Sequence, residues 1–135
     1  MAGPLILADT SAVVAFLRAS GTDANVRMRQ LLANDPPAVT EPVLLEVLAG
    51  ARSRADLRQV RQFLYSLDVV PVVGLDDNER AADLHRRCRT RGVTIRSLLD
   101  CLIAAVAIRV GAAVLHEDRD FDALAQHTEL ETVAL

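Results

Sequence analysis

The chain has 135 residues, of which 51% are hydrophobic and 3% are aromatic, and its formal net charge is −3. This length and composition predict one folded domain, over residues 1–135, with a mainly aliphatic core. The negative charge argues against binding of nucleic acid through bulk positive charge alone. All 15 basic residues are arginine. The lack of lysine excludes mechanisms that need a P-loop lysine or a Schiff-base lysine.

Two further features concern the location of the protein. The longest apolar run, residues 101–108, is far shorter than the ~18 residues of a membrane span. The first nine residues lack the basic region and long apolar stretch of a signal peptide. Cys88 and Cys101 have no metal-ligand spacing and are interpreted as reduced, buried residues. We therefore expect a cytoplasmic protein that does not contact a membrane.

The first half of the chain predicts two short strands and four helices. A continuous apolar run at residues 5–8 is typical of a buried strand. The boundaries of one helix are marked by Pro42, which is tolerated in a first turn, and by Gly50, which is typical of a helix end. In chain order, the expected elements are a strand at 5–8, helices at 11–18 and 23–34, a strand at 38–40, and helices at 42–50 and 53–67.

The second half continues the alternation of strands and helices. Residues 68–73 are rich in β-branched side chains and predict another buried strand, ended by Gly74. The remaining expected elements are helices at 75–91 and 97–110, a strand at 112–115, a helix at 121–127, and an edge strand at 130–135. Short apolar strands that alternate with helices indicate a parallel sheet covered on both faces. The fold class is therefore α/β.

Acidic residues occur where such a sheet would bind a ligand, at the carboxyl ends of its strands. Asp9 ends the first strand, and Asp118 follows the strand at 112–115. Glu46 and Asp100 interrupt otherwise apolar helices. If these carboxylates converge, they repel one another and their pKa values rise unless a cation neutralises them. Oxygen ligands without paired Cys or His favour Mg²⁺ or Mn²⁺ over Zn²⁺.

Each acid also has a purely structural interpretation. Asp9 is a common residue in a turn before a helix, and Glu46 can be a solvated helix flank. Asp100 follows a serine at the spacing of a capping box. Asp118 and Asp120 can start the helix that follows them, with Asp120 as its N-cap. Taken singly, none of these residues distinguishes a site from a cap.

Four segments, in order, carry a family resemblance. They are residues 7–11 (LADTS), 40–50 (TEPVLLEVLAG), 95–105 (IRSLLDCLIAA) and 116–121 (HEDRDF). Together they resemble the acidic motifs of PIN-domain ribonucleases of the VapC toxin type. The matching acids are Asp9, Glu46, Asp100 and Asp118, with Asp120 as an additional match.

The resemblance implies a three-layer α/β/α PIN-like sandwich with a mainly parallel sheet. It also implies a Mg²⁺- or Mn²⁺-dependent endoribonuclease, the toxin of a bacterial type II toxin–antitoxin pair. Asp9, Glu46, Asp100 and Asp118 would be catalytic metal ligands, and Asp120 an accessory catalytic residue. The implied partners are an RNA substrate, a VapB-like antitoxin whose C-terminal segment obstructs the acidic site, and a second copy of the chain.

Several residues keep two interpretations. His116 stands where the motif more often has Thr or Ser; it either donates a hydrogen bond to a carboxylate or phosphate, or is a strand-end histidine without a role, which we favour. Thr10 and Ser11 either help to hold a ligand or water, or cap a helix, and for Ser11 we favour the cap. Two arginine groups either guide RNA or form solvated faces. These groups are Arg86, Arg87, Arg89 and Arg91, and Arg52, Arg54, Arg58 and Arg61.

Two other functions compete with the nuclease. A phosphatase of the haloacid-dehalogenase type also begins with a strand-end Asp, but it needs a second Asp where Ser11 stands, and a lysine. The stronger alternative is a catalytically silent PIN-like module that binds RNA or protein. A cleavage assay with Mg²⁺ or Mn²⁺, and with EDTA as a control, distinguishes the module from the enzyme.

Overall fold

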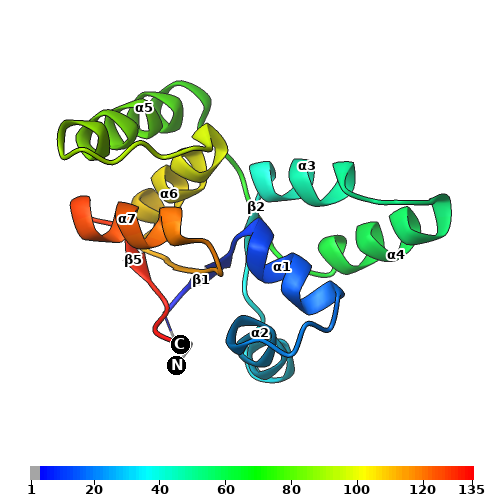
Figure 1. Cartoon of the computed structure of the whole chain (residues 1–135). Coiled ribbons are helices and arrows are strands. Elements are labelled where there is room, and N and C mark those ends of the chain that lie inside the picture. The colour runs from blue at the N-terminus through cyan, green and yellow to red at the C-terminus, as the bar shows by residue number, and fades with distance from the viewer. Residues whose placement is uncertain (1–3) are drawn as a thin grey trace.

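The computed structural model describes residues 4–135, which form five short strands and seven helices (Figure 1). In chain order these are β1 (Ile6–Ala8), α1 (Thr10–Leu17), α2 (Asp23–Asn34), β2 (Val39–Thr40), α3 (Glu41–Ala49), α4 (Arg54–Tyr65), β3 (Val69–Val70), α5 (Gly74–Thr90), α6 (Leu98–Val110), β4 (Ala113–Leu115), α7 (Arg119–His127) and β5 (Glu131–Thr132). In this part of the chain, no helix combines the length and hydrophobicity that crossing a membrane requires.

All strand pairs are parallel. One group has the order β1-β4-β5, and the other pairs β2 with β3. A parallel bridge between Leu7 and Ala38 joins the two groups, so that β1 lies between β4 and the β2 region. The predicted α/β class with a parallel central sheet is therefore confirmed.

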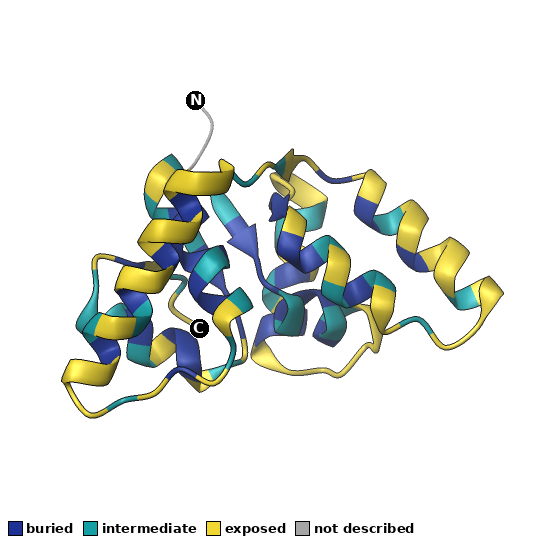
Figure 2. Cartoon of the chain, turned by 90° about the horizontal axis from the view of Figure 1, so that it is seen from above, coloured by how far each residue is buried: buried dark blue, intermediate teal, exposed yellow. Residues whose placement is uncertain are grey.

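The helices form two groups. Figure 1 shows α5, α6 and α7 on one side of the molecule and α1 to α4 on the other. Within the first group, α6 is the most deeply buried helix, and its residues Ile103 to Ala107 are completely inaccessible. Figure 2 shows that the buried residues of the other helices also face inward, while their outer faces are exposed. The apolar sequence of α6 thus reflects its position inside the protein.

The predicted buried strand at residues 68–73 is wrong in length and burial. Only Val69–Val70 is a strand, and Val69 is exposed. Pro71 follows at once and has no N–H to donate to a neighbouring strand. The strand also pairs with β2 alone, so it lies at an edge of the sheet. The β-branched run therefore continues as a connection to α5.

Candidate metal centre

Two of the predicted acids lie side by side at one edge of the sheet. Asp9 follows β1 directly, and Asp118 comes after β4. These strands are parallel neighbours in which Ala8 is paired with Leu115, and the Asp9 N–H donates to the Leu115 carbonyl at 3.1 Å. Parallel strands end at the same edge, as the sequence predicted.

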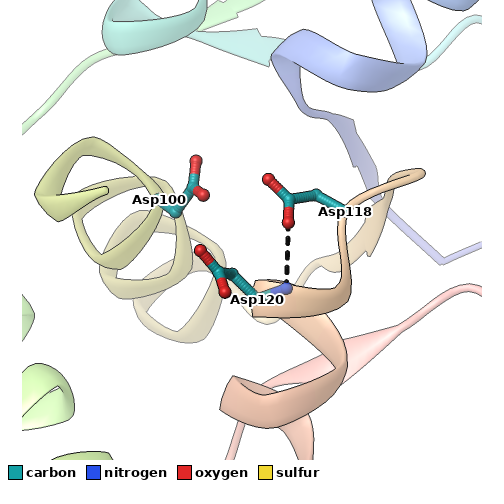
Figure 3. A group of neighbouring side chains, drawn as sticks. All are labelled: Asp100, Asp118 and Asp120. Atoms are coloured by element: carbon teal, nitrogen blue, oxygen red, sulfur yellow. Dashed lines mark hydrogen bonds between the residues drawn. The ribbon is translucent and has the colours of Figure 1, made fainter. Parts of the chain in front are cut away.

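Three carboxylates form the most compact group. One oxygen each of Asp100, Asp118 and Asp120 lies within 4.8 Å of the others. Figure 3 shows Asp100 on α6 facing Asp118 and Asp120 at the start of α7. The Asp118 carboxylate accepts a hydrogen bond of 2.9 Å from the Asp120 N–H. This bond holds the Asp118 side chain against the first turn of α7.

Hydrogen bonds orient the remaining two acids. The Ser11 hydroxyl lies 2.8 and 2.9 Å from the two oxygens of Asp9, and the Ala12 N–H also donates to that carboxylate. Thr10 donates from Oγ1 to Glu46 Oε1 at 2.8 Å. Both donors stand in the first turn of α1. This turn therefore positions one acid of the β1 end and one acid of α3.

Two carboxyl groups of this set, Asp9 and Asp100, have raised pKa values. Burial, together with a smaller repulsion from Asp118, raises the pKa of Asp9 to about 6. Burial and then the negative charges of Asp118, Asp9, Glu46 and Asp120 raise the pKa of Asp100 to about 7. Since all four other acids act on Asp100, the structure brings the five predicted residues into one electrostatic unit.

The donor set fits a hard divalent cation. Asp100 is only 7% exposed, yet its carboxylate accepts no hydrogen bond within residues 4–135. The close group contains carboxylate oxygens alone, which are the ligands that Mg²⁺ and related ions prefer. Burial raises the pKa of the neighbouring Cys101 thiol to about 12, so it stays protonated and does not compete as a soft ligand. A cation would offset both the burial and the repulsion that raise the pKa of Asp100.

The structural interpretations of the acids have different outcomes. Asp9 is indeed the N-cap of α1, in addition to its place in the group. The N-cap of α7 is Asp118, not Asp120, because the helix begins at Arg119. Ser97 is the N-cap of α6, but its side chain makes no capping hydrogen bond. Glu46 is half-buried, and its carboxylate accepts the Thr10 hydrogen bond, so it is held in place at the flank of its helix.

Ser11 and His116 both differ from the favoured predictions. Ser11 does not cap α1; its hydroxyl donates to Asp9 and accepts the Glu117 N–H at 2.7 Å. The buried His116 accepts the Asp118 N–H on Nδ1 at 3.1 Å, so the neutral ring carries its proton on Nε2. That nitrogen lies 3.6 Å from Asp122, which is exposed and outside the carboxylate group. Both residues hold the loop that carries Asp118.

One residue of the site was missed. Arg96 lies just before α6, and its backbone N–H donates to Asp120 Oδ2 at 3.3 Å. Its side-chain Nε is 3.7 Å from the same oxygen. Two members of the predicted arginine groups, Arg86 and Arg87, do not pair with the acids of the centre. They form ion pairs with Asp83 and Glu129. Only the position of Arg96 inside the third motif hinted at its contact with the site.

Comparison with known proteins identifies the family to which the chain belongs. The profile of the family described as "PIN domain" matches residues 6–126. The ribonuclease VapC11 of Mycobacterium tuberculosis is 41% identical over 135 residues, covering 96% of this chain and 98% of that protein. A VapC ribonuclease of Mycobacterium bovis is similar to the same degree. The chain therefore belongs to the PIN-domain family and, within it, to the VapC ribonucleases.

Solved structures show the same fold. VapBC2 from Rickettsia felis, bound to a DNA fragment of its promoter, contains a chain with a TM-score of 0.75 and 19% identity, covering 96% of this chain and 97% of that one. VapC20 of Mycobacterium tuberculosis, a toxin that cleaves the sarcin–ricin loop, has a TM-score of 0.66 and 26% identity, covering 93% and 98%. At such low sequence identities, these similarities show that the fold is shared, but they do not show which RNA this chain cleaves.

Proposed function

We propose that Asp9, Glu46, Asp100 and Asp118 hold Mg²⁺ or Mn²⁺ and that Asp120 assists them in the hydrolysis of RNA phosphodiesters. The chain then acts as the endoribonuclease toxin of a bacterial toxin–antitoxin pair. The observation that carries the proposal is the Asp100 carboxylate, which is buried, lacks a hydrogen-bond donor within residues 4–135 and is repelled by four other acids. A bare buried carboxylate is costly unless a cation offsets its charge.

The chain's own residues prepare this centre. Ser11 and the Ala12 N–H hold Asp9, Thr10 holds Glu46, and the Asp120 N–H holds Asp118. A bound divalent cation supplies neutralisation of phosphate charge and activation of water at neutral pH. Fixed ligand oxygens make that chemistry efficient, because no carboxylate has to reorient during the reaction.

Cleavage of total bacterial RNA tests the proposal. The wild type should cleave RNA with Mg²⁺ or Mn²⁺ and not with EDTA. Asp9→Asn, Glu46→Gln, Asp100→Asn and Asp118→Asn should each abolish cleavage, whereas Asp120→Asn should reduce it less. Asp122→Asn is the matched control, because Asp122 is exposed and outside the group. RNA binding without any cleavage would support the silent module instead.

Two protein partners belong to the proposal. Several similar structures are VapBC complexes, which supports a VapB-like antitoxin as a partner. A groove of about 390 Å³ is lined by Glu46 and by apolar side chains that include Val14, Leu17 and Val60. Arg18, Arg52 and Asp56 form the rest of its charged lining. Its apolar part suits an apolar segment that would obstruct Glu46. A homodimer follows from the family resemblance, and the cytoplasm from the location of the RNA substrate.

Expression in a bacterium tests the toxin role. Induction should stop growth by blocking translation, and the product of a small neighbouring gene should relieve the arrest. Copurification of the two products would identify the antitoxin. Equal arrest by the Asp9→Asn protein would rule out nuclease activity as the cause. Sedimentation of the purified chain measures whether it dimerises.

A further inference from the structure

The proposed metal centre has more negative charge than two divalent cations neutralise. Asp100 and the four acids that repel it carry up to five negative charges. Two divalent cations supply only four positive charges, and a substrate phosphate adds another negative one. An additional positive group at the rim would therefore favour binding of the phosphate. Because the chain has no lysine, arginine is the side chain that can supply a permanent positive charge there.

Arg96 is the arginine that pairs with an acid of the centre. Of the ion pairs within residues 4–135, only that of Arg96 includes an acid of the centre. By contrast, Arg109 is engaged by the buried Asp77 and by the Pro71 carbonyl. The Arg96 backbone is fixed, because it lies between the buried Ile95 and Ser97, the N-cap of α6, and donates to Asp120.

The tip of the Arg96 side chain is not held in the same way. The side chain is 66% exposed, and its Nε–Asp120 distance of 3.7 Å is too long for a hydrogen bond. A contact this long, made by an exposed guanidinium, contributes little to stability. A phosphate would offer the guanidinium two short, charge-assisted bonds in place of one long contact.

We propose that Arg96 binds an oxygen of the RNA phosphate that is held at the carboxylate centre. The inference rests on the proposed nuclease function and assigns a substrate contact to a residue outside the acidic set. The exchange moves the guanidinium from Asp120 to the phosphate, while the backbone N–H of Arg96 remains on Asp120.

The first measurement is RNA binding without cleavage. Affinity of the otherwise wild-type protein for a labelled random-sequence RNA pool is measured over a range of salt concentrations, with Ca²⁺ in place of Mg²⁺ so that a cation stays at the centre, and the RNA is checked to remain intact. Arg96→Gln should weaken binding about tenfold or more and reduce the slope of log K against log salt by about 0.7, the effect of one lost phosphate contact. Arg29→Gln is the control, because Arg29 is exposed on α2 and forms no ion pair within the described residues. Equal slopes for all three proteins would overturn the inference.

The second measurement is cleavage by the otherwise wild-type protein. Arg96→Gln should lower kcat/KM about tenfold or more, and Arg96→Lys should restore part of the loss, since lysine keeps the charge but lacks the planar fork. The same loss should appear in the Asp120→Asn protein. If it disappears there, Arg96 acts only through Asp120 and the phosphate contact is wrong. Failure of the wild type to cleave any RNA would contradict the nuclease function. The salt dependence of RNA binding would still show whether Arg96 contacts a phosphate.

Discussion

Thr10 Oγ1 donates a hydrogen bond of 2.8 Å to Glu46 Oε1, which joins the first turn of α1 to α3 across 36 residues of sequence. The contact matters because Glu46 belongs to a different helix from every other acid of the centre. A glutamate side chain has more rotatable bonds than an aspartate, so it needs such a partner to keep one orientation. The two residues therefore act as a pair.

Thr10→Val tests this pairing. Valine keeps the branched shape but loses the hydroxyl, and loss of such an outer partner typically costs about 10- to 100-fold in activity or metal affinity. We expect a loss in this range in RNA cleavage, with a folded protein by circular dichroism. Thr90→Val is the matched control, because it removes an exposed hydroxyl at the end of α5. Equal activity of the two variants would show that Glu46 needs no partner.

Ser11→Ala should change the pH dependence of metal binding. The Ser11 hydrogen bond lowers the pKa of Asp9, which burial has raised to about 6. Its removal should raise that pKa further, so Mn²⁺ should bind only at higher pH, since the ligand must be ionised. Calorimetric titration with Mn²⁺ at several pH values measures the shift. Ser66→Ala, which removes an exposed hydroxyl bonded to the Phe63 carbonyl, is the control. Coincident curves for Ser11→Ala and the wild type would contradict this role.

His116 should be replaceable by an acceptor of similar reach. Its Nδ1 accepts the N–H of Asp118, two residues further on, which is the hydrogen bond that an Asx turn makes. His116→Asn should therefore keep most of the RNA cleavage, whereas His116→Leu should lose about tenfold or more. Melting curves of both variants control for packing against Phe121. Similar cleavage by two folded variants would show that the loop does not need this bond.

Sequence patterns predicted the parts of the site that depend on chain order. Asp9 and Asp118 follow apolar strands, and parallel strands place their carboxyl ends together, so their proximity was predictable. The partners of these acids were not. Ser11 contacts Glu117 across 106 residues, and no local pattern encodes such a bond. A cap and a metal ligand also use the same residue type: Asp9 and Asp118 are helix caps and, in the proposed function, metal ligands as well.

The strand at residues 68–73 failed for a related reason. Its β-branched composition reports a preference for a pleated, half-buried surface, but burial depends on the neighbouring strands. Here β3 has only β2 beside it, and Pro71 ends the pairing. A proline within a β-branched run is itself a signal that the strand is short or lies at an edge.

Arg109→Leu should destabilise the fold without touching the centre. The completely buried Asp77 accepts hydrogen bonds from Arg109 Nε at 3.0 Å and from the Val73 N–H at 2.7 Å. Loss of the guanidinium leaves a buried charge without its partner, which costs about 3 kcal/mol. Urea unfolding measures the change. The exposed Arg86→Leu should change stability by less than ~1 kcal/mol. A similar small effect for both variants would contradict a structural role of the buried pair.

Asp100→Asn should have opposite effects on stability with and without metal. Burial and four negative neighbours raise the Asp100 pKa from 3.8 to about 7. Below about pH 3 the carboxyl group is protonated in both the folded and the unfolded chain. As the pH rises towards 7, the unfolded chain ionises first, so the metal-free fold loses stability. Asparagine removes this loss, and the metal-free variant should melt at least as high as the wild type near neutral pH, with a smaller difference at pH 5.

Added Mn²⁺ supplies the second half of the test. Metal at 100 times its Kd stabilises a protein by ~2.7 kcal/mol. For a chain of this size, that raises the Tm by an amount on the order of 10 °C. The wild type should show this rise, whereas Asp100→Asn should show little or none. The opposing interpretation uses the place of Asp100 in the first turn of α6, where the helix dipole would favour its charge by ~0.3–1 kcal/mol. A variant that melts lower without metal, yet gains as much from Mn²⁺ as the wild type, would show that Asp100 only stabilises its helix.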